Sequence, residues 1–324
     1  MNRREALQSL GLLATIALPT ISGAQTTYPT RPVTLIVPYS PGGATDNVAR
    51  VIAQHLQSAL GQPVIIDNRA GANGRIGTNA VAQAKPNGYV LLLGGIGPIT
   101  IAPHLESVPY DPFNDFQPIS LLVKNDVVLL VNPSVPADDV AALIKYLKAN
   151  PGKLNYASSG TGGPFHLSGE LFKSMAEVDL IHVPYKGDAP ALADLIAGNT
   201  QVMFTTISAC RQYIESKRVK AIASAGTERS SRLPDLPTIS ESGLPGFSSE
   251  TWQALFAPAG TPPDIINALE ASLIKTMKVP ALRTALQDQG NSVVGGGQAE
   301  CRQFIKAEYD KWGDVVAKAR ISAS

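Results

Sequence analysis

The stretch VTLIVPYSPGGATDNVAR, residues 33–50, decides how the first part of the chain folds. Its opening run, Val33–Val37, is β-branched and aliphatic and has the length of a buried strand. The turn Pro41-Gly42-Gly43 follows, and apolar residues then recur at helical spacing as far as a stop signal at Gly61. A helix that begins directly after a glycine turn aims its free N–H groups and its positive end at one spot. The stretch therefore predicts an anion site, although such a junction also serves as a plain tight turn.

A second stretch of the same kind lies in the middle of the chain. Residues 154–157 read as a strand, the loop SSGTGGP (158–164) follows, and apolar residues at helical spacing come next. Pro164 suits the first position of that helix, where its missing N–H would have no intrahelical partner. Because strands and helices alternate around both stretches, the sequence predicts an α/β fold with mostly parallel sheets flanked by helices.

The first 24 residues have the pattern of a signal peptide. Arg3 and Arg4 form a basic start, a short apolar run follows, and the small residues Ser22-Gly23-Ala24 suit a cleavage site. The apolar run is too short to span a bilayer as a helix. We therefore expect residues 1–24 to be removed on export, by either the Sec or the twin-arginine route.

The chain has 324 residues, which is enough for two domains with separate cores. Polar residues interrupt the apolar run 119–131, and this interruption marks a place where the chain can cross between domains. The proline-punctuated stretch 227–247 marks a second one. These breaks predict a discontinuous domain 1, made of residues 27–125 and 246–324, and a domain 2, made of residues 126–245.

The charge balance limits the possible partners, and the two cysteines raise the question of a disulfide. The formal net charge is +1, and removal of the signal peptide would make it zero (27 − 2 = 25 basic and 26 − 1 = 25 acidic residues). We therefore predict no nucleic-acid partner. Cys210 and Cys301 fall in different predicted domains, so two free thiols are favoured, although the sequence leaves a disulfide open.

Motifs of several enzyme classes are missing from the sequence. It contains no G-x-S-x-G, P-loop, H-E-x-x-H or C-x-x-C motif, and its four histidines do not have metal-ligand spacing. We therefore predict a protein that is not an enzyme and has no catalytic residue, metal or cofactor. One alternative stays open: a secreted α/β hydrolase of a small carboxylic ester, in which His166 would activate Ser158 or Ser159.

Segments spread over nearly the whole mature chain resemble one family, the periplasmic solute-binding proteins of tripartite tricarboxylate transporters, often called the Bug family. Each segment alone is unspecific, but together and in this order they are specific. The matching segments are VPYSPGGATDNVAR (37–50), DNRAGANGRIGT (67–78), VPYDPFNDFQPIS (108–120), SSGTGGPFHLSGELFK (158–173), HVPYKGDAPALADLIAG (182–198), LPDLPTISESGLPGF (233–247) and FAPAGTPPDIINAL (256–269).

The resemblance implies a two-lobed clamshell of the type II periplasmic-binding-protein kind, acting as a monomer in the periplasm. Its cleft would capture a small carboxylate and deliver it to the membrane subunits of a tripartite transporter; a receptor that serves a sensor kinase would use the same cleft. The family's ligand-contacting loops correspond to Ser40, Gly42, Gly43, Ala44, Thr45 and Asp46 in one lobe. In the other lobe they correspond to Ser158, Thr161, Gly162, His166, Lys186, Gly187, Asp188 and Thr205.

Some of these residues allow more than one interpretation. Asp46, in the first turn of its helix, either complements the helix dipole, or has a sharper role in which it holds the glycine loop in shape or accepts a donor of the ligand. Lys186 either meets the ligand or is simply solvated. The sequence also departs from the family pattern, because Glu177 stands where glycine is usual and Thr205-Thr206 replaces a frequent acidic position. These departures leave the identity of the ligand open.

Overall fold

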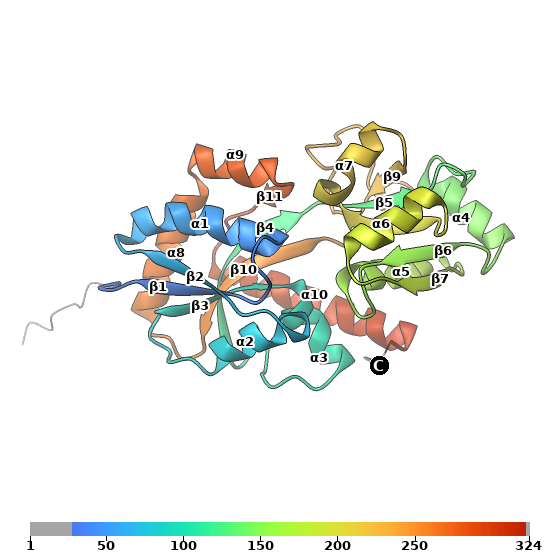
Figure 1. Cartoon of the computed structure of the whole chain (residues 1–324). Coiled ribbons are helices and arrows are strands. Elements are labelled where there is room, and N and C mark those ends of the chain that lie inside the picture. Colours follow the sequence, from blue (N-terminus) through green and yellow to red (C-terminus); the bar gives the residue numbers. More distant parts are fainter. Residues whose placement is uncertain (1–27, 322–324) are drawn as a thin grey trace, which may run out of the picture.

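The computed structural model describes residues 28–321, so the predicted signal peptide lies outside the described residues. Two sheets, each covered by helices on both faces, form two lobes that lie side by side (Figure 1). We call the lobe with the six-stranded sheet the first lobe and the lobe with the five-stranded sheet the second lobe. Among the described residues, no helix is both long and apolar enough to cross a membrane.

The first lobe contains strands from both ends of the described chain. In spatial order they are β11 (Asn291–Val293), β4 (Phe116–Asn125), β10 (Thr251–Pro258), β3 (Val90–Gly95), β1 (Val33–Val37) and β2 (Val64–Asn68). Its helices are α1 (Ala44–Leu60), the short η1 (Ala72–Gly74), α2 (Arg75–Ala82), the π-helical turn η2 (Gly97–Ile101), α3 (Ala102–Leu105), α8 (Pro263–Met277), α9 (Pro280–Asp288) and α10 (Gln298–Ala319).

The second lobe is built from the middle of the chain. Its strands, in spatial order, are β7 (Ile181–Pro184), β6 (Asn155–Ser158), β8 (Val202–Thr206), β5 (Val127–Val131) and β9 (Lys220–Ser224). Its helices are α4 (Val140–Ala149), α5 (Pro164–Ala176), α6 (Asp188–Ala197) and α7 (Ile207–Glu215). Along the chain, the strands of the first lobe therefore stop before residue 126 and resume at Thr251. The domain boundaries predicted at 125/126 and 245/246 stay predictions.

The strands read as continuous apolar runs because both faces of each sheet are buried. In β1, Leu35 packs toward α1 and α8, whereas Ile36 packs toward α2 and α10. In β5, Leu129 packs toward α4 and α5, whereas Leu130 packs toward α6 and α7. Successive side chains of a strand point to opposite faces, so these runs bind helices on both sides of each sheet.

Most strands of each sheet run in one direction. In the first sheet, β1, β2, β3 and β4 share a direction, and β10 and β11 oppose it. In the second sheet, β5 opposes β6, β7, β8 and β9. The prediction of mostly parallel sheets is therefore confirmed for strand direction, but the ladders that involve β5 and β10 are antiparallel. Both of these strands adjoin the places where the chain passes between lobes.

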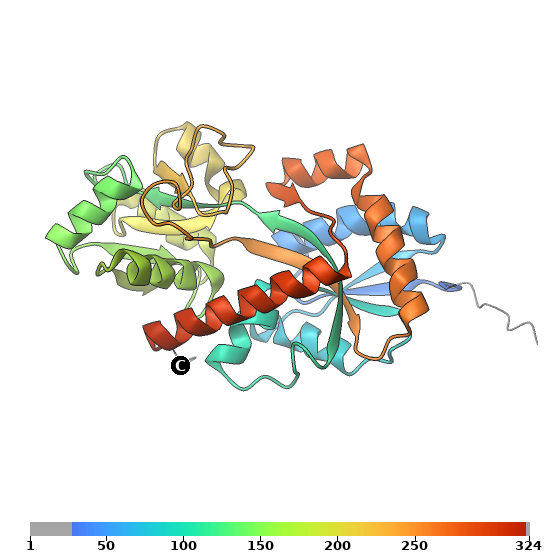
Figure 2. The same ribbon diagram turned by 180° about the vertical axis from the view of Figure 1, so that it is seen from behind.

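The two crossings of the chain are bonded to each other. Lys124 pairs with Glu250 at 3.1 Å, and the Thr251 hydroxyl donates to Asn125 Oδ1 at 3.1 Å. Helix α10 also joins the lobes, since Trp312 packs in one cluster with Leu167 of α5. Figure 2 shows this helix running from the first lobe toward the second. A change in the angle between the lobes must therefore occur at these paired strands and along α10.

Helix α5 ends at a strained residue, and this strain leads to a prediction. Glu177 has φ +52° and ψ 52°, a left-handed conformation that costs an L-residue about 1–2 kcal/mol and that glycine adopts freely. We expect Glu177→Gly to raise the free energy of unfolding by about 0.5–1 kcal/mol, after the larger entropy of the unfolded glycine chain is subtracted. Urea denaturation measures this change. Glu177→Ala, the control, should give no increase, and a destabilised glycine variant would contradict the assignment of strain.

Candidate functional site

A cavity of about 290 Å³ lies between the lobes beside the two crossings, and we call it the hinge cavity. Asn125 and Thr251 line it at the crossings, and Tyr39 lines it from the loop after β1. The other lining residues are Ala44 and Thr45 of α1, Gly95 at the end of β3 and Ile96 after it, Pro164 and Phe165 of α5, Asp188 of α6, Thr206 of β8, and Trp252 and Gln253 of β10. The N-terminal ends of helices from both lobes therefore meet at this cavity.

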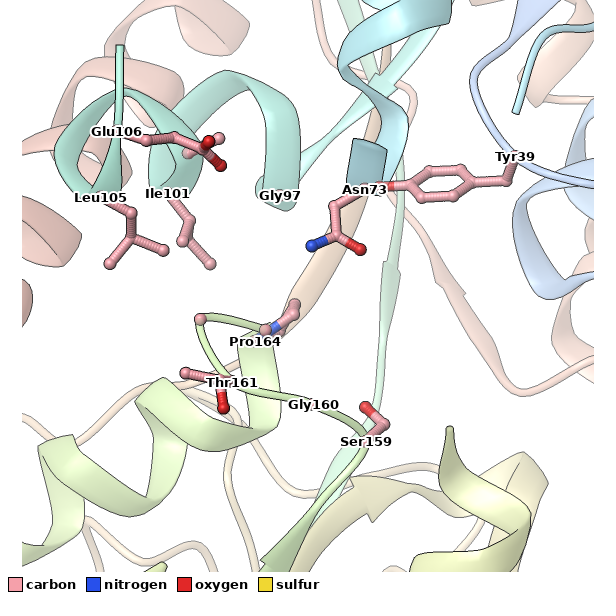
Figure 3. Close-up of a pocket in the computed structure, with 13 residues that line it drawn as sticks. Tyr39, Asn73, Gly97, Ile101, Leu105, Glu106, Ser159, Gly160, Thr161 and Pro164 are labelled. Atoms are coloured by element: carbon pink, nitrogen blue, oxygen red, sulfur yellow. The ribbon is translucent and has the colours of Figure 1, made fainter. Parts of the chain in front are cut away.

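A second cavity, of about 200 Å³, adjoins helix α3, and we call it the α3 cavity. Figure 3 shows Tyr39 and Asn73 of the first lobe on one side of it and Ser159, Thr161 and Pro164 of the second lobe on the other. Tyr39 and Pro164 line both cavities, so they stand at the boundary between them.

The first glycine loop is held in shape by Asp46. Its carboxylate accepts hydrogen bonds from the Gly42 N–H at 2.9 Å, from Asn68 Nδ2 at 3.0 Å and from Arg50 Nε at 2.8 Å. Burial alone would raise the pKa of Asp46, but the hydrogen bonds outweigh this effect and hold the pKa below its ordinary value. Gly42 has φ +81°, which favours glycine. Of the two interpretations of Asp46, the structure supports the one in which it shapes the loop.

The second glycine loop is held in a matching way by His166. The Gly162 N–H donates to His166 Nδ1 at 2.9 Å, as the Gly42 N–H donates to Asp46, and in both loops the acceptor comes four residues later. Each acceptor lies in the first turn of the helix that follows its loop. His166 therefore supports the loop rather than facing an open cavity.

Ser158 does not pair with His166, so the Ser158–His166 pair considered for a hydrolase is wrong. The Ser158 hydroxyl lies 2.7 Å from Nε2 of His182, on the neighbouring strand β7. Ser158 is fully buried, and a nucleophile must reach its substrate. The serine and histidine therefore form a structural hydrogen bond.

The rings of His166, His182 and Tyr156 are stacked beneath the second loop. The two imidazole centroids are 3.8 Å apart with an interplanar angle of 10°, and His182 stacks on Tyr156 at 4.8 Å. Burial lowers the pKa of His166, and burial together with the nearby His166 and Lys173 lowers the pKa of His182 to about 4. Both imidazoles are therefore neutral at pH 7, which keeps Nδ1 of His166 free to accept the Gly162 N–H.

Acidification is expected to destabilise the protein through His182. Its folded-state pKa of about 4 lies below the ordinary 6.5, so the unfolded chain takes up a proton first as the pH falls. The stabilisation is complete above about pH 6.5 and is lost between about pH 6.5 and 4, where the unfolded state binds more protons. We expect roughly 1 kcal/mol less stability at about pH 5 than at about pH 7.5, because the partial exposure of the ring reduces the roughly 2 kcal/mol that the full pKa difference would give.

Urea denaturation at the two pH values measures this loss. His182→Gln, which keeps a group able to hydrogen bond to Ser158 but does not titrate, should lose most of the pH dependence. A variant with an unchanged pH dependence would contradict the role of His182.

The structure brings only some of the predicted site residues to the two cavities. Ala44, Thr45 and Asp188 line the hinge cavity, and Thr161 and Gly162 line the α3 cavity. Asp46, Ser158, His166 and Thr205 are buried and line neither cavity. Ser40, Gly42, Gly43, Lys186 and Gly187 also line neither cavity; all but the half-buried Gly187 are exposed.

The hinge cavity is also lined by residues that were not predicted from the sequence, chiefly Tyr39, Trp252 and Gln253. Trp252 and Gln253 are only 1% and 6% exposed, yet Trp252 Nε1 and Gln253 Oε1 have no hydrogen-bond partner in the protein. Asp188 Oδ1 is also buried without a partner. Buried polar atoms are normally paired, so unpaired ones around a cavity indicate a place for a polar ligand. A glutamine inside the apolar strand 251–258 was the available sequence signal.

Other expectations concern metals and cysteines. The described part of the chain contains no group of three or more histidine, cysteine or acidic residues that could hold a metal ion. Cys210 and Cys301 are free and buried, as favoured from the sequence, and burial raises the pKa of each thiol to about 12.

Comparison with known proteins matches this chain to one family of receptors and to solved structures of similar sequence. The family model described as the tripartite tricarboxylate transporter family receptor matches residues 48–321. Protein BugT of Bordetella pertussis is 37% identical over 318 residues, which cover 98% of this chain and 98% of BugT. The structure of R. palustris Rpa4515 with adipate has 35% identity and a TM-score of 0.77, covering 91% of this chain and 99% of that one. MatC from Rhodopseudomonas palustris with bound malate has 35% identity and a TM-score of 0.74, covering 89% of this chain and 100% of that one. These matches confirm the two-lobed α/β fold.

Proposed function

Because this chain belongs to the tripartite tricarboxylate transporter receptor family, as its sequence predicted, we propose that it captures a small carboxylate in the hinge cavity and delivers it to a membrane transporter of that type. The proposal includes export to the periplasm by the Sec or the twin-arginine route, action as a monomer, and domain boundaries at 125/126 and 245/246. The chain is a solute-binding protein and not an enzyme, like the binding proteins that it resembles.

The observation that carries this proposal is that the first turns of two helices from different lobes line one cavity, each directly after a glycine loop. Helices α1 and α5 begin directly after these loops, and Thr45 and Pro164 bring their first turns to the hinge cavity. Helix N-termini carry free N–H groups and partial positive charge, so they favour a carboxylate. No lysine or arginine is among the residues that line this cavity. Backbone N–H groups, hydroxyls and the indole N–H of Trp252 are therefore donors available to the anion.

The two-lobed arrangement supports a receptor that closes on its ligand. A carboxylate that contacts both loops binds more tightly when the lobes are close, and this difference in affinity shifts the molecule toward the closed state. A thermal-shift screen of mono-, di- and tricarboxylates tests the proposal. We expect at least one of them to raise the melting temperature and to be recovered unchanged; no response across all three classes would refute a carboxylate receptor.

Two substitutions test which groups hold the anion. Thr45→Val removes a hydroxyl from the wall of the hinge cavity at nearly constant volume, and we expect it to weaken binding about tenfold. Lys186→Ala should weaken binding by less than about threefold, because this lysine is exposed and lines neither cavity. Calorimetry with the acid found in the screen measures both. A loss of binding in Lys186→Ala with none in Thr45→Val would show that a cation, not the helix N-terminus, recognises the carboxylate.

Thr161→Val extends this test to the α3 cavity. The Thr161 side chain lines that cavity and not the hinge cavity. A loss of affinity similar to that of Thr45→Val would mean that the ligand contacts both cavities.

A further inference from the structure

The hinge cavity is lined by a carboxyl group with one oxygen atom that has no hydrogen-bond partner in the protein. Asp188 is the first residue of α6, and Gly187 before it has φ +112°, a conformation that favours glycine at this turn. Asp188 lines the hinge cavity, and its Oδ1 atom is buried with no hydrogen-bond partner. Asp126 and Glu250, the carboxyl groups near the crossings, are instead paired with Ser292 and Lys124. The Ser159 hydroxyl donates to the Asp188 carboxyl group, but the Oδ1 atom of that group is a buried acceptor that lacks a donor.

Gln253 supplies an independent second observation on the same cavity. It is 6% exposed, lies on β10 of the opposite lobe, and its Oε1 is also buried without a donor. A buried acceptor left unpaired is unfavourable, so a ligand that offers N–H or O–H donors would satisfy both atoms. A simple alkyl dicarboxylate in its ionised form offers acceptors only. It would leave Asp188 and Gln253 unpaired and would bring a second negative charge toward Asp188.

The remaining polar groups of the cavity favour a carboxylate. Trp252 Nε1 is a buried donor without a partner, and the first turns of α1 and α5 present N–H groups and positive potential. The cavity therefore has donors suited to an anion and, separately, two acceptors that include a carboxyl group.

We infer that the ligand is a small amino-carboxylate, whose carboxylate meets the helix N-termini and Trp252 and whose ammonium group meets Asp188 and Gln253. This inference rests on the proposed function, because it assigns the ligand class of the same cavity. An ammonium group has three N–H donors and a positive charge, so it can satisfy both acceptors at once. Burial raises the pKa of Asp188 and the Ser159 hydroxyl opposes that rise, and an ammonium partner would lower the pKa further.

Matched pairs of ligands that differ by one amine test the inference. We would compare glutamate with glutarate and aspartate with succinate by calorimetry at neutral pH, on the wild type, Asp188→Asn and Asp179→Asn. Asp179 is an exposed carboxylate of the same lobe that lines neither cavity, so its variant controls for the loss of one negative charge. In the wild type, the amine-bearing member of at least one pair should bind at least about tenfold more tightly. Asp188→Asn should abolish this preference, and Asp179→Asn should retain it.

The outcomes separate this inference from the proposed function. Equal or tighter binding of the plain dicarboxylates by the wild type would overturn the inference and leave the carboxylate receptor standing. The same holds if Asp188→Asn keeps the wild-type preference. If Asp188→Asn does not fold, the wild-type ratio alone decides between support and refutation. If no carboxylate binds at all, with or without an amine, both the inference and the proposed function fail.

Discussion

Replacing Asp46 by alanine is expected to weaken ligand binding at least about a hundredfold and to lower the free energy of unfolding by about 2–3 kcal/mol. The carboxylate is 1% exposed and accepts from the Gly42 N–H and from Asn68 Nδ2. Without it these two donors lose their partner, and the loop before α1 loses the bond that fixes its shape. Asn68 also donates to the Tyr39 carbonyl at 3.0 Å, so the effect extends to a residue that lines both cavities.

Arg50→Ala separates the loop contact from the ion pair. Arg50 also bonds to Asp46, but its side chain is 55% exposed, and exposed pairs contribute about 0–1 kcal/mol. We expect Arg50→Ala to change stability by less than about 1 kcal/mol and affinity by less than about threefold. Urea denaturation and calorimetry measure both variants. Equal losses of stability and affinity in Asp46→Ala and Arg50→Ala would mean that the ion pair, and not the bond to Gly42, maintains the loop.

Gly169→Ala is expected to lower the free energy of unfolding by about 3 kcal/mol, although alanine is the better helix former by about 1 kcal/mol. Gly169 lies inside α5, and a Cβ atom there would clash with the ring of Tyr156 at Cε2. This ring cannot move aside easily, because its hydroxyl bonds to Glu170 at 2.7 Å and its face stacks on His182. The clash of the added Cβ atom with the Tyr156 ring is therefore expected to cost more stability than the higher helix propensity of alanine gains.

Ser174→Ala is the matched control on the same helix. Ser174 is exposed, so only helix propensity changes there, and we expect a gain of up to about 0.5 kcal/mol. Thermal or urea denaturation of the two variants compares packing with propensity directly. A Gly169→Ala variant as stable as the wild type would mean that α5 can shift away from Tyr156 at little cost.

The two glycine loops share a geometry but differ in chemistry. Each is held by a side chain that accepts the N–H of a loop glycine four residues earlier, Asp46 for Gly42 and His166 for Gly162. The Asp46 carboxylate accepts at all pH values above its lowered pKa, whereas His166 Nδ1 accepts only while the imidazole is neutral. We therefore expect acid to loosen the loop of the second lobe before that of the first.

The sequence by itself determined most of the longer helices and strands and the two glycine loops, because these depend on neighbours along the chain. The apolar run Val33–Val37, the glycine after it and Pro164 at a helix start each act within a few residues. The family segments then gave the order of these elements and the two-lobed fold.

Only the tertiary structure decided which side chains meet, since those contacts join residues that are distant in sequence. Ser158 faces His182 rather than His166 because β6 and β7 are adjacent in the sheet. The short strand β11 was not foreseen, because its three residues are held by pairing with β4, far earlier in the chain. Gln253 and Asp188 line one cavity because the chain crosses twice between the lobes and brings β10 and α6 together there, a placement that no local pattern specifies.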